Sequence, residues 1–276
     1  MRCPILHGSN AYGPSPGNRS RDIIILKPYS ANFRFYEELN DFLPRQNHKR
    51  TVEYRFKGKP AIKDPIEVLG IPHTEVDLIV VDGESVDFSY GLKNGDRVAV
   101  YPVFESFDIS PIVRLREKPL RSTAFIVDVN LGKLARRLRM LGFDAVYSNR
   151  GNDQQVVDIA VNEKRIVLTR DRRLLFRKAV THGYWIRSVE VDTQILEVLD
   201  RFDLHRLVRP FKRCLDCNGA IEPVADKTRI ISRLEPLTRR YYNEFYHCVQ
   251  CDKSYWQGSQ VENMLKAIQQ LRIQVP

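Results

Sequence analysis

The chain has 276 residues, enough for two or three small domains, and its 43% apolar and 28% charged residues are ordinary for a protein with a buried core. No apolar run approaches the roughly 20 residues of a membrane helix, and no secretory signal is visible, so we expect a cytoplasmic protein with no membrane partner. The net charge is +10, and the whole excess lies in residues 112–213, which carry 22 Lys or Arg against 12 Asp or Glu. This surplus favours a polyanionic partner, although a solvated basic surface has the same composition.

The N-terminal part divides into two segments of different composition. Residues 1–22 are rich in Gly, Pro and Ser and are predicted to form a disordered tail. Residues 23–105 contain strand patterns with a short helix between them, which predicts a small α+β domain. The clearest strand patterns are RTVEYRF (50–56), VDLIVV (76–81) and NGDRVAVYP (94–102).

The same segment resembles a known fold. FRFYEELNDFLP, VLGIPHTEVDLIVVDG and NGDRVAVYP are similar to the ubiquitin-like β-grasp domain found ahead of some bacterial nuclease domains. Sulfur carriers with that fold end in Gly-Gly, whereas this segment continues as YPVFESFDIS. The resemblance therefore implies a structural role or a docking surface for a protein partner. Residues 106–121 are predicted to be a linker to the next domain.

Residues 122–210 alternate short apolar strands with helices. Strands are predicted at 124–128, 143–148, 165–169 and 184–188, and helices at 131–141, 153–164, 171–181 and 192–202. Repeated βα units predict a parallel sheet flanked by helices, which makes the fold class α/β. Ligands of such sheets bind at the carboxyl ends of the strands.

Three aspartates are expected near that edge of the sheet. Asp128 closes one strand and Asp171 follows another, so their carboxylates are predicted to point into the same crevice. Asp153 starts the helix at 153–164, in the N-cap position, and the helical wheel directs it toward the strand ends. Converging carboxylates suit Mg²⁺ or Mn²⁺, which take oxygen ligands and can activate water for attack on a phosphodiester. The alternative is that each aspartate merely caps or ends an element.

A second resemblance makes these roles more specific. FIVDVNLGKLARRLRMLGFDAVYS and DQQVVDIAVNEKRIVLTRDRRLL resemble the Mut-seven C-terminal RNase domain, a branch of the PIN-like nucleases, over residues 123–270. The resemblance implies a ribonuclease in which Asp128, Asp153 and Asp171 are catalytic and hold Mg or Mn. Many relatives carry another acid two residues after the last of these, where this chain has Arg173, so a fourth ligand is not expected there.

Residues for RNA contact are predicted beside the aspartates. Asn130 is expected to orient metal or substrate, with capping of the helix at Leu131 as its alternative. Arg136 and Arg170 are expected to hold phosphates, with a plain surface charge as the alternative for each.

The C-terminal segment, residues 211–276, contains two CxxC pairs. The cysteines are Cys214, Cys217, Cys248 and Cys251. Two such pairs satisfy the tetrahedral preference of zinc and leave no open position, so we expect a structural zinc ribbon. Disulfides are the alternative, but a reducing compartment favours the metal. His247 is a substitute ligand, Cys3 has no assigned role, and the zinc ribbon is expected to shape or cover the aspartate crevice.

Two functions of different classes follow from these patterns. The first is a Mg- or Mn-dependent ribonuclease that binds RNA through its basic central domain. The second is a non-catalytic RNA-binding or adaptor protein, which the arginine at position 173 keeps open. Nothing in the sequence indicates an oligomeric state.

Overall fold

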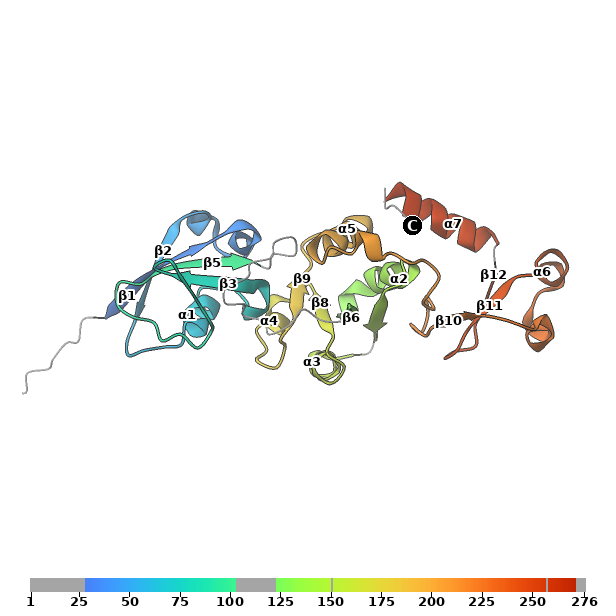
Figure 1. Ribbon diagram of the computed structural model, residues 1–276, viewed down its shortest axis with the longest axis horizontal. Coiled ribbons are helices and arrows are strands. Elements are labelled where there is room, and N and C mark those ends of the chain that lie inside the picture. The colour runs from blue at the N-terminus through green and yellow to red at the C-terminus, as the bar shows by residue number, and fades with distance from the viewer. Residues whose placement is uncertain (1–27, 103–122, 150, 257, 272–276) are drawn as a thin grey trace, which may run out of the picture.

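The computed structural model describes residues 28–102, 123–149, 151–256 and 258–271. Three parts follow one another along the long axis of the molecule, in the order of the sequence (Figure 1). The predicted tail at 1–22, the predicted linker at 106–121 and Cys3 lie outside the described residues. Among the described residues, no helix has both the length and the apolar character needed to cross a bilayer.

The first part is a five-stranded sheet that carries a short helix. Its strands are β1 (Tyr29–Phe35), β2 (Thr51–Phe56), β3 (Val76–Val81), β4 (Glu84–Val86) and β5 (Arg97–Pro102), and its helix is α1 (Lys63–Val68). The strand order is β2-β1-β5-β3-β4, with β1 parallel to β5 and the other pairs antiparallel. Alternate residues of β1 are fully buried, as the period of a half-buried strand requires. The expected β-grasp sheet is thus confirmed.

The second part is a four-stranded sheet in which every strand pairs in parallel. Its strands are β6 (Ala124–Val127), β7 (Asp144–Tyr147), β8 (Ile166–Thr169) and β9 (Gly183–Trp185), in the order β7-β6-β8-β9. Its helices are α2 (Gly132–Met140), α3 (Asp153–Asn162), α4 (Arg172–Leu175) and α5 (Val191–Arg201). Helices α2 and α5 share one apolar cluster with the sheet, and α3 and α4 share another. The predicted parallel sheet flanked by helices is therefore confirmed.

The helix predicted at 171–181 is much shorter in the structure. Helix α4 ends at Leu175, and the chain then turns back toward β9. Val180 is 1% exposed and packs in the same cluster as Leu174 and Leu175. A continuous helix would carry the chain away from β9, whose first residue, Gly183, comes only three positions after Val180. The burial of Val180 therefore outweighs the local helical preference.

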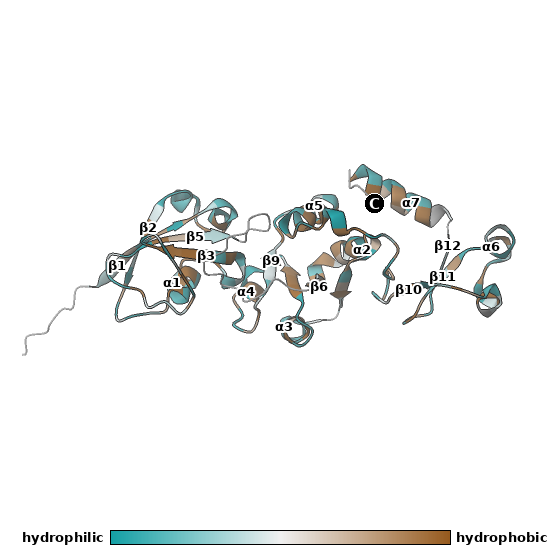
Figure 2. Cartoon of the chain, in the orientation of Figure 1, coloured by the Kyte–Doolittle hydropathy of each residue, from teal (hydrophilic) through white to brown (hydrophobic). Residues whose placement is uncertain are grey.

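The third part contains a small antiparallel sheet and a helix that returns to the second part. Strands β10 (Ile221–Pro223), β11 (Phe245–Cys248) and β12 (Ser254–Trp256) pair in that order, with α6 (Pro236–Tyr241) before β11. Helix α7 (Ser259–Gln270) then lies beside α2 and α5 and adds Ile268 and Leu271 to their cluster (Figure 1). Figure 2 shows apolar and polar bands alternating along α7, as expected of a helix with one buried face.

Gly142 ends α2 at a point where no side chain fits. Its φ is +95°, and a Cβ at this position would lie 2.0 Å from the carbonyl oxygen of Arg209. We expect Gly142→Ala to lower the free energy of unfolding by about 2–4 kcal/mol, because both the backbone strain and the clash must be relieved. Urea unfolding of Gly142→Ala and of the control Gly91→Ala measures this loss of stability. At Gly91 an added Cβ meets nothing within 4 Å. Equal stability of the two variants would contradict the expected clash.

Candidate functional site

Asp128 and Asp171 are connected through one buried hydroxyl at the carboxyl edge of the parallel sheet. Asp128 follows β6, is 4% exposed, and accepts a hydrogen bond from Val129 N at 2.6 Å. The Thr169 hydroxyl at the end of β8 donates to the other Asp128 oxygen at 2.7 Å and accepts from Asp171 N at 2.9 Å. The side chain of Thr169 is fully buried. Sequence patterns did not single out Thr169, although it stands between the strand and the Asp171 turn.

The carboxylate of Asp171 is occupied by an arginine. It caps α4 by accepting from Arg173 N at 2.9 Å, and the Arg173 guanidinium donates to both of its oxygens at 2.8–3.2 Å. Hydrogen bonding by this guanidinium is the main reason that the pKa of Asp171 lies below its usual value. Arg173 stands where many relatives of the resembled family carry a fourth acid. In this chain it is the partner of Asp171, the third acid.

Asp153 belongs to α3, and its charge acts on the Arg173 guanidinium that pairs with Asp171. Its expected N-cap position was wrong by one residue: Asn152 is the cap of α3 and forms a capping box with Gln155. Asp153 is the first residue of the helix and is exposed. In the part of the chain that the structure describes, the aspartates do not gather their carboxylates into a metal-binding group.

The three residues predicted to contact RNA have different surroundings. Asn130 is exposed, and it does not cap α2: the turn before that helix is capped by Asp128. Arg170 is exposed and donates to the carbonyl of Ser188 at 2.6 Å. Arg136 is paired with Asp216 of the third part at 2.9 Å. Asn130 and Arg170 therefore flank the aspartates, whereas Arg136 is also a link between domains.

The four cysteines do lie close enough together to hold one metal ion. Their sulfur atoms all lie within 4.8 Å of one another, with 3.6 Å between Cys214 and Cys251 and 3.3 Å between Cys217 and Cys248. Disulfide sulfurs lie about 2.05 Å apart, so the four thiols are not paired as disulfides. Four thiolates at about 2.3 Å from a central ion give sulfur separations near these values. The arrangement is consistent with a structural zinc site.

Donors around Cys214 favour its thiolate, whereas burial raises the pKa of the Cys217 and Cys251 thiols. The Tyr255 hydroxyl donates to Cys214 Sγ at 3.0 Å, and backbone N–H groups donate to Cys217 and Cys248 at 3.4 Å. Burial raises the pKa of the Cys214 thiol, but hydrogen bonds from Tyr255 and from backbone N–H groups outweigh burial and hold this pKa at about 6. A thiolate is the form that binds zinc.

The first cysteine pair is anchored at the amino end of β7, away from the aspartates. Asn218, next to this pair, accepts from Ala145 N at 3.0 Å and donates to Asp144 at 2.7 Å. Arg139 of α2 is 5% exposed and donates to the carbonyls of residues 215 and 216 at 3.1 and 2.9 Å. The polar partners of this pair lie at the opposite end of the strand from the aspartates, and whether the rest of this part covers the aspartates stays a prediction.

Asp144 is the charged centre of that anchor. Arg165 and Arg213 contact it at 2.6 and 3.1 Å. Burial raises the pKa of Asp144, but the hydrogen bonds from Arg165 and Asn218 and the two positive charges outweigh burial, so the pKa is lowered.

We expect Asp144→Asn to lower the free energy of unfolding at pH 7 by about 1–3 kcal/mol, because two arginines lose their counter-ion. Because folding lowers the pKa of Asp144, its ionised carboxylate stabilises the fold at pH values above its pKa in the unfolded chain, about 3.9. This contribution is lost as the pH falls through the pKa in the folded protein. The difference between the proteins, measured by urea unfolding, should therefore shrink below about pH 4. Asp192→Asn, which removes an exposed ion pair with Arg137, is the control and should change stability by less than about 1 kcal/mol. A constant difference from pH 7 to pH 3 would contradict the assignment.

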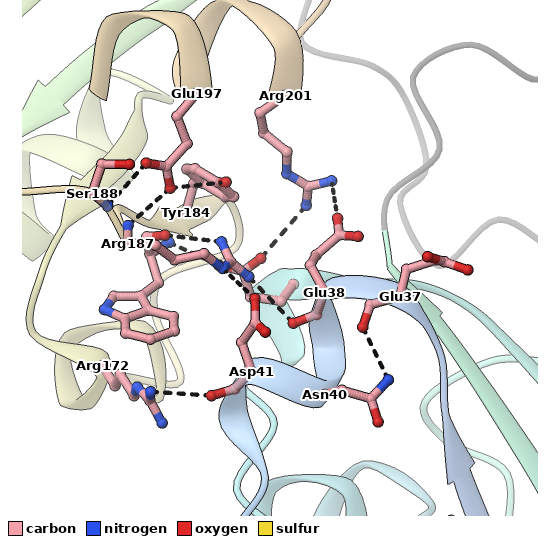
Figure 3. Close-up of polar contacts among 12 residues, drawn as sticks. Glu37, Glu38, Asn40, Asp41, Arg172, Tyr184, Arg187, Ser188, Glu197 and Arg201 are labelled. Atoms are coloured by element: carbon pink, nitrogen blue, oxygen red, sulfur yellow. Dashed lines mark hydrogen bonds and ion pairs between the residues drawn. The ribbon is translucent and has the colours of Figure 1, made fainter. Parts of the chain in front are cut away.

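The β-grasp part covers the free edge of β9, a contact that no sequence pattern indicated. Trp185 N donates to Glu75 at 2.8 Å, and the His73 ring contacts the carbonyl of Val180 at 2.9 Å. Glu75 is fully buried and lies 3.6 Å from the guanidinium of Arg201. Figure 3 shows the neighbouring contacts of Arg172, Arg187 and Arg201 with residues 38 and 41. An exposed edge strand is a liability, and here another domain of the same chain covers it.

Comparisons with known proteins agree with this architecture. A family model described as Mut7-C ubiquitin matches residues 29–108, and one described as the Mut7-C RNAse domain matches residues 123–268. Among solved structures, the chain is similar to H. volcanii small archaeal modifier protein 1, at 16% identity and a TM-score of 0.22, over 27% of this chain and 97% of that chain. This likeness is too slight to carry an argument. A search of curated proteins found no match. Because the RNAse model covers more than half of the 276 residues, the protein belongs to the Mut7-C RNAse domain family.

Proposed function

We propose that the protein is a metal-dependent ribonuclease whose active site surrounds Asp128. The observation that carries the proposal is the burial of this carboxylate at the carboxyl edge of the sheet, where α/β sheets bind ligands. Burying a carboxylate is costly unless hydrogen bonds compensate, and Val129 N and the Thr169 hydroxyl supply them. A buried acid held by hydrogen bonds at this edge of the sheet is therefore our candidate for the centre of the site.

The donor atoms suit Mg²⁺ or Mn²⁺. Asp128, Asp153 and Asp171 offer oxygen ligands only, which these ions prefer. Asp153 and Asp171 are solvent-accessible, so their carboxylates can turn toward Asp128, with Asp171 leaving Arg173. When bound, such an ion activates a water and stabilises the charge that develops on a phosphodiester.

The residues that flank the aspartates are proposed to hold RNA. Arg170 follows Thr169 directly, Asn130 follows Asp128 by two positions, and both are exposed close to the acids in sequence. An exposed guanidinium binds phosphate oxygens on either side of the cleaved bond, and an exposed amide can bond the ribose or a phosphate. The surplus of basic residues in 112–213 would add the non-specific part of the affinity.

The four cysteines are proposed to hold a structural zinc ion. Their four thiolates complete a tetrahedral shell without an open position, so the ion would hold the third part together and take no part in cleavage.

A non-catalytic RNA-binding protein is the second candidate. The observation that favours it is the bidentate pairing of Arg173 with Asp171, which already neutralises one of the acids. In that case the protein would bind RNA with a salt dependence set by its basic residues, and added metal would change nothing.

Labelled single-stranded and structured RNAs, incubated with freshly purified protein, separate the two candidates. The ribonuclease predicts cleavage with Mn²⁺ or Mg²⁺ and none with EDTA. Binding without cleavage under every metal condition would overturn the proposal and support the second candidate.

A further inference from the structure

The turn that carries Asp171 begins a helix whose position depends on packing against its neighbours, including the burial of Leu174 and Leu175. Helix α4 contains four residues, and isolated helices of that length are unstable in water. Arg173 is 90% exposed, so its pairing with Asp171 adds little rigidity. The position of Asp171 therefore depends on the contacts of its neighbours.

Arg172, the residue after Asp171, is held by the β-grasp part. Its guanidinium lies 3.8 Å from the ring centre of Trp185 and 5.2 Å from that of Phe42, and it donates to the carbonyl of Asp41 at 3.2 Å (Figure 3). A planar guanidinium stacked on aromatic rings with a hydrogen bond in its plane has few alternative positions.

The residues that hold Arg172 are themselves firmly placed. Trp185 packs against both the core of the β-grasp part and the cluster beneath α3 and α4. Phe42 is 6% exposed and lies 5.1 Å from the Trp185 ring. Arg187 donates to the Asp41 carboxylate at 2.8 Å, from the opposite side to Arg172 in Figure 3. The contact thus belongs to a packed interface rather than to two surface loops that happen to touch.

From these contacts we infer that Arg172 is a positioning residue: stacked on Trp185 and lying beside Phe42, it holds the Asp171 turn in place, so the β-grasp domain is a structural part of the nuclease site. This inference rests on the proposed function for its consequence in catalysis, but the placement of the turn can be tested without it. The β-grasp domain then has a role within this chain: residues 41 and 42 set the position of an acid more than 120 residues away in sequence.

The test compares Arg172→Gln, Arg172→Lys and the control Arg177→Gln. Arg177 is exposed and lies in the same segment, and among the described residues its side chain makes no hydrogen bond, ion pair or cation-π contact. Circular dichroism and thermal unfolding first establish that each variant folds. Hydrogen exchange is then measured on peptides spanning 169–176, where the amides of Asp171 and Arg173 are bonded to Thr169 and Asp171. Cleavage kinetics of the full chain follow, with kcat and KM determined separately.

We expect several-fold faster exchange over 169–176 in Arg172→Gln and a kcat about 10-fold lower at unchanged KM, because a misplaced acid impairs the chemical step. Arg172→Lys, which keeps a cation over Trp185, should recover part of both, and Arg177→Gln should match the wild type. If Arg172→Gln does not fold, the lysine variant decides by the same two measurements.

Other results would overturn the inference. Exchange over 169–176 equal to that of the control would show that Arg172 does not hold the turn. A raised KM with unchanged kcat would show that Arg172 acts on RNA binding instead. If the wild type cleaves no RNA, the proposed function fails, while the exchange data still decide whether the β-grasp domain positions Asp171.

Discussion

Asp128→Asn is expected to lower the rate of RNA cleavage by about 100-fold or more, the largest effect of any single substitution on activity. Asparagine has the same shape and can still accept from Val129 N, so the fold should be preserved. It lacks the negative charge, and its amide group would face the Thr169 hydroxyl, which now donates to the carboxylate. Both the affinity for a divalent cation and the alignment of the group are therefore lost.

The measurement is kcat/KM on labelled RNA with saturating Mn²⁺, together with thermal unfolding of each protein. Asp158→Asn is the matched control: it removes the same charge from an exposed position on α3, where the carboxylate accepts from Gln154. The control should cleave at the wild-type rate. Wild-type activity in Asp128→Asn itself would place the chemistry elsewhere in the chain.

Loss of one cysteine ligand is expected to have the largest effect on stability. Structural zinc contributes about 10–16 kcal/mol of apparent binding free energy in zinc-finger peptides at pH 7, and small zinc domains unfold without it. In Cys248→Ser we expect zinc to be lost and the sheet of β10, β11 and β12 to unfold. Helix α7 follows that sheet and packs on α2 and α5, so the stability of the second part should fall as well.

Elemental analysis and thermal unfolding test this expectation. The wild type should contain about one zinc per chain and should unfold at lower temperature after treatment with a strong chelator. Cys3→Ser, which removes the one cysteine outside the group, should keep both the zinc and the wild-type unfolding temperature. Full zinc content in Cys248→Ser would rule out the four-sulfur site.

Part of the aspartate site follows from local patterns. Asp128 and Asp171 each come at or just after the end of a short apolar strand, and parallel strands bring their carboxyl ends to one edge, so their proximity was predictable. The hydroxyl of Thr169 that joins them was not, because a threonine at the end of a strand has many uses. The pairing of Arg173 with Asp171 was also missed. The sequence showed only that Arg173 stands where relatives carry an acid, and the structure shows that its side chain pairs with Asp171.

The helix boundaries, too, follow only in part from local sequence. The capping box of Asn152 with Gln155 is a local feature, yet the sequence contains two adjacent residues able to cap, and only the backbone of the folded chain distinguishes them. The length of α4 depends on the burial of Val180 in a cluster formed with α3 and the sheet, which no window of the sequence contains.

The sequence by itself determined the order of domains, the parallel sheet and the four-cysteine group, because these depend on strand period, βα alternation and the spacing of ligands a few residues apart. Only the tertiary structure decided what the arginines of the central domain do. Arg136 pairs with the cysteine-bearing part, Arg172 and Arg187 contact the β-grasp domain, and Arg170 donates to the Ser188 carbonyl of its own domain. The composition shows the net charge of these arginines. It does not show the partners that they have in other domains, because contacts between residues 80 to 146 positions apart have no periodicity and arise only when separate domains pack together.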